Sequence, residues 1–421
     1  MIKAIFEIEG GRSLEGEINI SGAKNAALPL LAAACLGEEP TTLQNMPVQL
    51  NDVQVLIQLF QAMGASIDVD GDTVRCERGQ ANGGNVPAEL AYHVRYSLLL
   101  LGYFAALRQT VFLPLPGGCH IGERKHDLHV MGLRALGANV DELKNGILLK
   151  SDQLAGAHID FYLPTTSGTE NIMLAAVLAK GTTIIRNANT RPEVQQMGQL
   201  LAAMGADITV QNRIIEVNGV QRLQGGATLS VMAGWDEAVT YIIAAGLTRG
   251  EIAIHNFDLT HIKEDTRYIR EAGIKLFEWR DNVYVSAKDI EIRPFELFTA
   301  PYPGVNSDMQ PIFAALALTI PGTSVITDLR FTDRFDYVEQ LKLFQGDIEA
   351  FGNTAIVRGG KALIGTQVRA TDLRGGAACV LCGLAAEGTT FIDNIFQIER
   401  GYECMAEKLT GLGASIRRRE T

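Results

Sequence analysis

The residues best suited to chemistry lie in one glycine-rich stretch, Leu115-Pro116-Gly117-Gly118-Cys119-His120-Ile121-Gly122-Glu123-Arg124. Its glycines allow the backbone to adopt positive φ and to approach a ligand closely. A cation beside a thiol favours the nucleophilic thiolate, so Arg124 and other nearby cations would activate Cys119. Taken alone, the stretch is equally compatible with a surface hairpin that contains an incidental cysteine, because glycine loops are common. Cys119 is therefore a candidate reactive group, and the rest of the chain must decide its role.

Further cations stand at the beginning of apolar segments that we expect to be helices. Lys24, Arg95 and Arg374 occupy such positions. A cation at a helix N-terminus opposes the macrodipole, which costs up to about 1 kcal/mol unless an anion lies between. The serine, threonine and aspartate residues at the same places are ordinary N-caps and require no ligand. Capping does not explain the three cations, which predict an anion site built from helix ends.

A second set of arginines shares one position of an internal repeat, which we expect to be the first turn of an amphipathic helix. They are Arg124, Arg191, Arg334 and Arg400. The planar guanidinium stays charged and matches two oxygens of a carboxylate or a phosphate. A single arginine of this kind is more often a surface or capping residue, but a set aligned by a repeat favours anion binding.

Sequence motifs for a zinc site or for a bound nucleotide cofactor are absent. Cys119, His120, His126 and His129 do not have the spacing of a structural zinc site, and Cys379-x-x-Cys382 lacks a second pair. No G-x-G-x-x-G follows a strand-like segment, and no Walker phosphate loop occurs. Cys35, Cys379 and Cys382 lie in apolar helical segments, where we expect inert thiols. We therefore expect neither a metal nor a dinucleotide cofactor.

The length and charge of the chain limit its class. With 421 residues it exceeds the roughly 250 to 300 residues of a single core, so we expect two domains with a cleft between them. The net charge of −11 and a pI near 5.2 argue against nucleic acid or an anionic membrane surface as the main partner. Residues 1–8 read as a strand rather than a signal peptide, and the apolar runs are too short to span a bilayer. We expect a cytoplasmic protein with free thiols.

A repeat predicts the architecture. Glycine follows helix-like segments at positions 64, 137, 205, 273, 346 and 413, a spacing of roughly 70 residues that indicates six repeats. Each repeat reads as a strand, an amphipathic helix that ends at the glycine, two short strands, and a helix that is apolar on nearly every side. A helix apolar all round must be buried. The buried helices are expected at residues 26–35, 98–107, 172–178, 241–247, 311–318 and 377–385.

These observations predict an α/β fold of two similar domains, each with three repeats, helices inside and mixed sheets outside. The repeat boundaries place one domain at residues 23–232, with the Cys119 loop, and the other at residues 233–421. Residues 1–22 precede the first repeat, and we expect them to complete the sheets of the second domain.

The sequence resembles the enolpyruvyl transferases over essentially its whole length. The motifs that carry the resemblance are Ser21-Gly22-Ala23-Lys24-Asn25-Ala26-Ala27-Leu28-Pro29, Leu115-Pro116-Gly117-Gly118-Cys119, Ser307-Asp308-Met309-Gln310, Ala370-Thr371-Asp372-Leu373-Arg374 and Arg400-Gly401-Tyr402-Glu403. The fold of that family is a pair of inside-out, barrel-like α/β domains of three repeats each, in agreement with the repeat count.

The resemblance implies transfer of enolpyruvate from phosphoenolpyruvate to the 3'-hydroxyl of UDP-N-acetylglucosamine, with release of phosphate and without a cofactor. The resemblance also implies that this transfer is the first committed step of peptidoglycan synthesis. Cys119 would be the general acid, the transient covalent partner and the alkylation point for fosfomycin, and Asp308 would bind or deprotonate the acceptor hydroxyl. The cations implied for phosphate and carboxylate are Lys24, Arg95, Arg124, Arg374 and Arg400. Further substrate-binding residues implied are Asn25, Asp127, Leu128, Ser167, Gly168, Arg334 and Asp372.

The chain departs from the usual family sequence on the acceptor side and at the hinge. The departures are Lys125-His126 for Pro-(Val/Ile), Thr166-Ser167-Gly168-Thr169-Glu170 for Ser-Val-Gly-Ala-Thr, Gly234-Trp235-Asp236-Glu237 for Asp-Arg-x-Glu, and Arg191 for a glutamate. Two alternatives therefore stay open: a paralogue that acts on another nucleotide such as UMP, and a non-catalytic binding protein of the same fold. Retention of Cys119, Asp308 and the cations counts against the second alternative.

Overall fold

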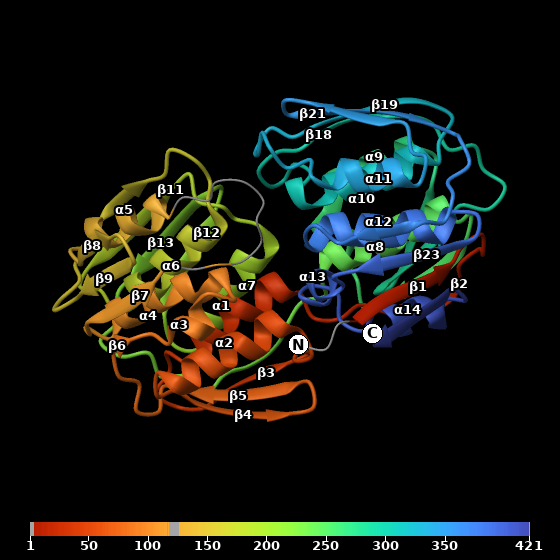
Figure 1. Cartoon of the computed structure of the whole chain (residues 1–421). Helices are drawn as coiled ribbons and strands as arrows, with labels where there is room; N and C mark the ends of the chain where they lie inside the picture. Colours follow the sequence, from red (N-terminus) through yellow and green to blue (C-terminus); the bar gives the residue numbers. More distant parts are fainter. Residues whose placement is uncertain (1–3, 116, 118–125, 421) are drawn as a thin grey trace. The chain divides into compact units, whose positions relative to one another are not determined.

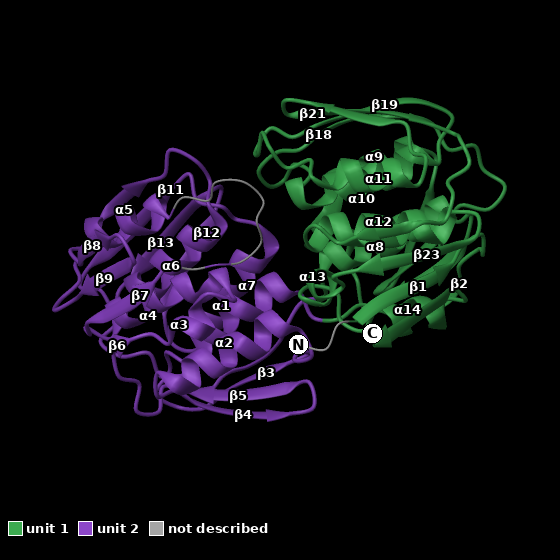
Figure 2. Ribbon diagram, viewed as in Figure 1, with its two compact units in different colours: residues 1–21, 119–123, 233–421 green, residues 22–118, 124–232 purple. Residues whose placement is uncertain are grey.

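The computed structural model describes residues 4–115, 117 and 126–420. Cys119 and Arg124 lie outside these residues, as do Lys125 and most of the glycine-rich stretch. Within the described residues, unit 1 contains 4–21 and 233–420, and unit 2 contains 22–117 and 126–232 (Figure 2). No helix in the described part of the chain is long and apolar enough to cross a membrane.

Each unit is built around three inner helices (Figure 1). In unit 2 they are α1 (Lys24–Ala34), α4 (Leu99–Ala106) and α6 (Thr166–Ala176), and in unit 1 they are α8 (Trp235–Leu247), α10 (Gln310–Leu318) and α12 (Leu373–Ala385). The three helices of each unit contact one another, and every residue of α4, α8 and α10 is buried. Their sequences are apolar on nearly all sides, which is why they form the cores.

Amphipathic helices lie outside these cores. They are α2 (Asn51–Ala62), α5 (Asp127–Ala135), α7 (Pro192–Ala203), α9 (Lys263–Glu271), α11 (Tyr337–Leu343) and α14 (Met405–Gly411). Short helical turns complete the connections: α3 (Ala88–Ala91), η1 (Arg95–Leu98), η2 (Leu259–Ile262), η3 (Ser307–Met309) and α13 (Phe396–Glu399). The alternation of buried and half-exposed helices confirms the predicted division of each repeat into an inner and an outer helix.

Three four-stranded sheets belong to unit 2. The first has the order β14-β3-β5-β4, with β14 Thr228–Ser230, β3 Thr41–Gln44, β5 Thr73–Glu77 and β4 Ser66–Asp70. The second has the order β6-β7-β9-β8, with β6 Gly84–Asn85, β7 Val111–Pro114, β9 Gly146–Lys150 and β8 Asn139–Leu143. The third has the order β10-β11-β13-β12, with β10 His158–Asp160, β11 Thr182–Arg186, β13 Ile214–Asn218 and β12 Asp207–Gln211.

Unit 1 repeats this plan. Its first sheet has the order β2-β15-β17-β16, with β2 Glu15–Asn19, β15 Glu251–His255, β17 Asn282–Ser286 and β16 Lys275–Trp279. Its second has the order β18-β19-β21-β20, with β18 Glu296–Phe298, β19 Gly322–Thr327, β21 Thr354–Gly359 and β20 Ile348–Phe351. Its third has the order β22-β23-β1-β24, with β22 Gln367–Arg369, β23 Thr389–Asp393, β1 Ala4–Glu9 and β24 Ser415–Glu420.

The N-terminal strands complete two sheets of unit 1. β1 lies antiparallel between β23 and β24, and β2 runs parallel to β15. The short edge strands β6, β10, β14, β18 and β22 were not predicted. They have only two or three residues each, too few for a visible alternation, yet each pairs in parallel with the first strand of another repeat.

The glycine that ends the outer helix has a positive φ in most repeats, for example 91° at Gly64 and 97° at Gly137. This is the left-handed conformation expected for a helix stop. The fifth repeat corrects the prediction, because Gln345 takes the positive φ of 64° there and Gly346 does not. A Cβ atom at Gly346 would lie 2.7 Å from the Leu341 carbonyl oxygen, so this glycine is required by close packing instead.

Candidate active site

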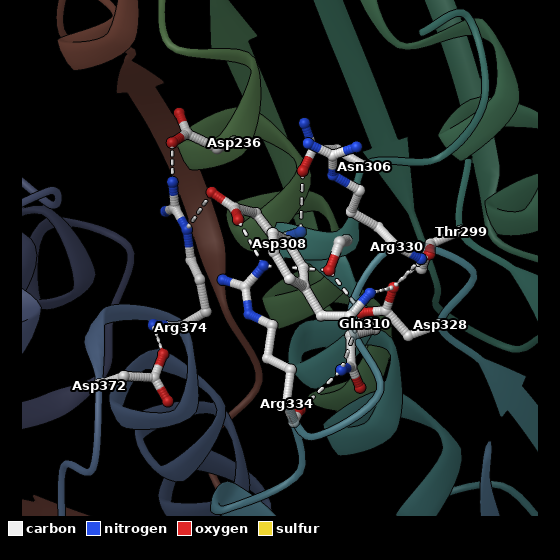
Figure 3. A network of polar contacts seen from close by, with 12 residues as sticks. Asp236, Thr299, Asn306, Asp308, Gln310, Asp328, Arg330, Arg334, Asp372 and Arg374 are labelled. Atoms are coloured by element: carbon white, nitrogen blue, oxygen red, sulfur yellow. Dashed lines mark hydrogen bonds and ion pairs between the residues drawn. The ribbon is translucent and has the colours of Figure 1, made fainter. Parts of the chain in front are cut away.

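The Asp308 carboxylate is held between two guanidinium groups of unit 1 (Figure 3). Its Oδ1 lies 2.7 Å from Arg334 Nη1, and its Oδ2 lies 3.5 Å from Arg374 Nε. The side chain of Asp308 is 24% exposed, whereas those of Arg334 and Arg374 are 6% and 1% exposed. Asn306 caps the turn η3 by accepting the Asp308 N–H at 2.9 Å. The carboxylate therefore lies at the border between buried cations and solvent in a fixed orientation.

Arg374 is placed by the start of α12. Asp372 is the N-cap of this helix and accepts the N–H groups of Arg374 at 2.9 Å and Gly375 at 3.2 Å. The guanidinium binds the Asp236 carboxylate from α8 and lies 5.1 Å from the centre of the Tyr402 ring. The cation that opposes the helix dipole is thus compensated by a protein carboxylate, at least in part.

Asp328, directly after β19, organises the polar network behind Asp308. This buried carboxylate accepts hydrogen bonds from Thr299 Oγ1 at 2.8 Å, from Arg330 N at 2.8 Å and from Ser307 Oγ. Ser307 Oγ in turn accepts a hydrogen bond from Arg334 Nη1 at 3.1 Å. The contacts fix the guanidinium of Arg334. Sequence analysis missed Asp328 because no motif marks a carboxylate at the end of a strand.

The described arginines of the repeat-aligned set lie before the outer helices and not in their first turns, which corrects the prediction. Arg191 is the N-cap of α7, Arg334 lies two residues before the N-cap of α11, and Arg400 is the C-cap of α13. Gln310 Nε2 donates to the Arg334 carbonyl at 2.8 Å and so fixes this connection to α10. In a connection, an arginine avoids the unfavourable first turn of the helix dipole.

In unit 2, Lys24 is the first residue of α1 and lies 3.2 Å from the Asp52 carboxylate of α2. Both side chains are nearly buried, with 11% and 8% exposure. Asn25 follows Lys24 in the first turn and is half-buried. Asp52 was missed by sequence analysis because only the packing of α1 on α2 brings it to Lys24.

The predicted acceptor-side residues of unit 2 lie at the starts of two contacting helices. Asp127 and Leu128 begin α5, whereas Ser167 and Gly168 stand in the first turn of α6. Thr165 caps α6 by accepting the Gly168 N–H at 3.3 Å. The fold therefore brings these four residues together.

His129 joins the two helix starts. Its Nε2 lies 3.1 Å from Ser167 Oγ, and its ring is buried. Burial lowers the pKa of His129 to about 3, and the positive charge of Arg95 on η1 contributes to the same shift. The ring is therefore neutral at physiological pH. The structure thus places Arg95 near the same site, although sequence analysis gave His129 no role other than a rejected metal ligand.

The EPSP synthase (3-phosphoshikimate 1-carboxyvinyltransferase) family matches residues 8–409, almost the whole chain. The chain belongs to this enolpyruvyl transferase family. UDP-N-acetylglucosamine 1-carboxyvinyltransferase 1 of Carboxydothermus hydrogenoformans is 40% identical over 414 residues, which cover 98% of both chains. UDP-N-acetylglucosamine 1-carboxyvinyltransferase of Coxiella burnetii is 41% identical over 415 residues, 98% of this chain and 95% of its own. The crystal structure of the enolpyruvyl transferase NikO from Streptomyces tendae matches 100% of both chains, with a TM-score of 0.90 and 25% identity.

These comparisons confirm the resemblance, the α/β fold class and the assignment to the carboxyvinyltransferases. Several of the departures from the usual family sequence are buried, among them Glu170 and Trp235. Glu170 is fully buried, and its carboxyl oxygens have no hydrogen-bond partner among the described residues. Burial raises its pKa well above the ordinary value, the Glu193 charge raises it further, and the Arg191 charge opposes this. Glu170 and Arg191, two departures from the family, thus belong to one cluster in which Arg191 Nε lies 2.9 Å from the buried Glu193 carboxylate.

The thiols of this enolpyruvyl transferase that the structure describes are poor nucleophiles. Cys35, Cys76, Cys379 and Cys382 are buried, and burial raises the pKa of Cys379 to about 12. Cys404 is half-buried, and its pKa is raised by burial and then by the charges of Glu407 and Glu403. Among the described residues, no group of three or more His, Cys, Asp or Glu side chains is arranged to hold a metal ion.

Proposed function

We propose that this chain transfers the enolpyruvyl group of phosphoenolpyruvate to the 3'-hydroxyl of UDP-N-acetylglucosamine and releases phosphate, the first committed step of peptidoglycan synthesis. The observation that carries the proposal is about 40% identity, over 98% of this chain, to relatives named UDP-N-acetylglucosamine 1-carboxyvinyltransferase. Family membership alone would leave the acceptor undefined, since the family is named for 3-phosphoshikimate 1-carboxyvinyltransferase.

Phosphoenolpyruvate would be bound by Lys24, Arg95, Arg124, Arg374 and Arg400. The geometry of Arg374 supports its part in this, because the Nη1 group is buried and has no hydrogen-bond acceptor among the described residues. A buried donor left without a partner costs about 1–3 kcal/mol, which an anionic ligand would recover. Cations held in place before the reaction also stabilise the charge that develops on the departing phosphate.

The acceptor would be oriented by Asp308, whose carboxylate is fixed by Arg334 and Arg374 and is still partly exposed. We assign it the role of accepting a hydrogen bond from the 3'-hydroxyl or of removing its proton. Further contacts with the nucleotide sugar are assigned to Asn25, Asp127, Leu128, Ser167 and Gly168. The Asp372 side chain acts through Arg374, since it caps the helix on which that arginine stands.

In the proposed reaction, the acceptor oxygen adds to the central carbon of phosphoenolpyruvate while the methylene carbon receives a proton. The tetrahedral adduct then loses that methyl proton and expels phosphate, which leaves the enol ether. Cys119 is assigned as the general acid and transient covalent partner, and as the site of fosfomycin alkylation. Exclusion of water would protect the adduct from hydrolysis.

A second candidate is an enolpyruvyl transferase that acts on another nucleotide, such as UMP. The departure from the usual family sequence at residues 166–170 favours it. The burial of Glu170 and its neighbour Thr169 weakens this reading, because buried side chains at this position do not present new groups to a ligand.

Steady-state release of phosphate from phosphoenolpyruvate separates the candidates. UDP-N-acetylglucosamine is expected to support turnover, and UMP is expected to support none. Turnover with UMP alone would reject the proposed acceptor, and no turnover with any uridine nucleotide would favour the non-catalytic alternative. We also assign the enzyme to the cytoplasm, in line with the expectation from the sequence, and propose no nucleic acid, membrane or cofactor as a partner.

A further inference from the structure

A chain of hydrogen bonds runs through the interior of unit 2 and ends at the hydroxyl group of Ser167. The backbone N–H of Gly102 on α4 donates to Asn171 Oδ1 at 2.7 Å. Asn171 Nδ2 on α6 lies 2.9 Å from His129 Nδ1 on α5, and His129 Nε2 lies 3.1 Å from Ser167 Oγ. Gly102, His129 and Asn171 are buried, whereas Ser167 is partly exposed at the first turn of α6.

The direction of every bond in this chain follows from its first member. A backbone N–H can only donate, so the atom of Asn171 that faces Gly102 must be the oxygen, and the amide nitrogen must face His129. An amide nitrogen is a donor, so His129 Nδ1 must be the acceptor and carry no proton. In a neutral imidazole the proton then lies on Nε2, which donates to Ser167 Oγ.

The neighbourhood of His129 keeps the ring in this state. Protonation would place a second donor against Asn171 Nδ2, in a site already closed to solvent. The charged or titratable groups that act on the ring are Arg95, His126 and Asp127, and Asp127 is the only one of them that favours the imidazolium. With burial, the two other groups hold the pKa of His129 at about 3.

We propose that His129 is a positioning residue that makes the Ser167 hydroxyl a permanent donor toward the acceptor substrate. Since Ser167 Oγ already receives the imidazole N–H, its own proton must point to another group. Among the described residues no further partner of this hydroxyl exists. The proton lies at the N-terminus of α6, where the helix dipole also favours an anionic oxygen such as that of a diphosphate. This inference rests on the proposed function only for the identity of the ligand.

The tautomer is measured directly on the full chain without ligand. Long-range proton–nitrogen correlation spectra of protein labelled at its seven histidines, with His129 assigned from a His129→Gln variant, report which ring nitrogen carries the proton. We expect Nε2 to be protonated and Nδ1 to be bare from pH 5 to pH 9. A proton on Nδ1, or an imidazolium in this range, would overturn the proposal whatever the enzyme binds.

The effect on the ligand is measured by calorimetric titration with UDP-N-acetylglucosamine. His129→Gln keeps both polarities, since the amide oxygen can accept from Asn171 and the amide nitrogen can donate to Ser167. It should stay within about threefold of the wild-type Kd. His129→Leu removes both bonds and frees the Ser167 proton to turn away, so its Kd should rise about tenfold, the lower end of the range for one hydrogen bond to a charged group.

Ser167→Ala provides the control for a merely structural effect. In the Ser167→Ala background, His129→Leu should raise the Kd by less than about twofold, because no hydroxyl remains for His129 to orient. We call this chain of hydrogen bonds from Gly102 through Asn171 and His129 to Ser167 the relay. The relay would be contradicted if His129→Gln and His129→Leu lost the same affinity for UDP-N-acetylglucosamine. It would also be contradicted if His129→Leu raised the Kd by a full tenfold in the Ser167→Ala background. A wild type that binds UDP-N-acetylglucosamine but releases no phosphate would reject the proposed reaction while these ratios still decide the role of His129.

Discussion

The buried pair of Arg374 and Asp236 gives the sharpest test of how unit 1 is built. Their side chains are 1% and 7% exposed. Removing one partner of such a pair leaves an uncompensated charge and costs about 3–5 kcal/mol, whereas replacing both partners by apolar side chains is often close to neutral. Arg374→Met should therefore lower the free energy of unfolding of unit 1 by about 3–5 kcal/mol, and Asp236→Leu should have a similar effect.

The double variant Arg374→Met/Asp236→Leu should recover much of this loss, although Asp308 still loses one of its two guanidinium partners. We expect a coupling free energy of at least about 1.5 kcal/mol in urea unfolding followed by circular dichroism, with Asp308→Asn as a matched single change in the same network. Phosphate release should stay abolished in the stable double variant, because Arg374 is assigned to phosphoenolpyruvate. Additivity within about 0.5 kcal/mol, or an active double variant, would refute the reasoning.

Three further predictions concern single positions. Fosfomycin should alkylate the wild-type protein once and the Cys119→Ala variant not at all, as measured by intact mass spectrometry. The reason is that the described thiols are buried or have a raised pKa. Labelling of Cys404 instead would contradict this prediction. Gly64→Ala should destabilise unit 2 by more than about 1 kcal/mol, because its φ is 91° and the new Cβ would lie 2.3 Å from the Gln80 carbonyl oxygen. The control Gly388→Ala has φ 87° and open space at that position, so thermal unfolding should show a smaller loss. Since the folded-state pKa of Glu170 is raised, the folded protein keeps a proton that the unfolded chain releases, and stability is lost as the pH rises above about 4.5. Glu170→Gln should therefore stabilise the protein more at pH 8 than at pH 5, and an equal effect at both pH values would count against a protonated Glu170.

Much of the fold could be predicted because each repeat shows short sequence patterns that indicate its helices and their ends. Apolar runs such as residues 98–107 identify the inner helices, and glycines such as Gly64 identify the ends of the outer helices. The two-residue strand β6 could not be predicted, because two residues show no periodicity and its existence depends on pairing with β7. The positive φ of Gln345 was missed because the neighbouring Gly346 matched the pattern of a glycine at the end of the outer helix.

The candidate site divides in the same way. Asp308, Lys24 and Arg374 stand in motifs that the chain carries intact, so sequence alone selected them. Their partners Asp52 and Asp236 come from other helices, and only packing brings them to the cations. Compensation by these carboxylates explains part of the positive charge at helix starts, which the sequence had attributed wholly to a ligand.

The relay through His129 shows what no motif could provide. The direction of its hydrogen bonds depends on a backbone N–H of α4, at Gly102, that is remote in sequence from both His129 and Ser167. A pattern search finds histidines by spacing to other ligands, and this histidine has no such spacing. The role of His129 becomes visible only once the inner helices α4 and α6 and the outer helix α5 are packed together.

The most direct test of the central claim is the structure of the product. Wild-type enzyme incubated with phosphoenolpyruvate and UDP-N-acetylglucosamine should give equal amounts of phosphate and of a nucleotide sugar heavier by one enolpyruvyl group. Proton and carbon NMR should place the enol ether on the 3'-oxygen of the sugar. Phosphate without this product, or an enol ether formed only on another nucleotide, would contradict the account.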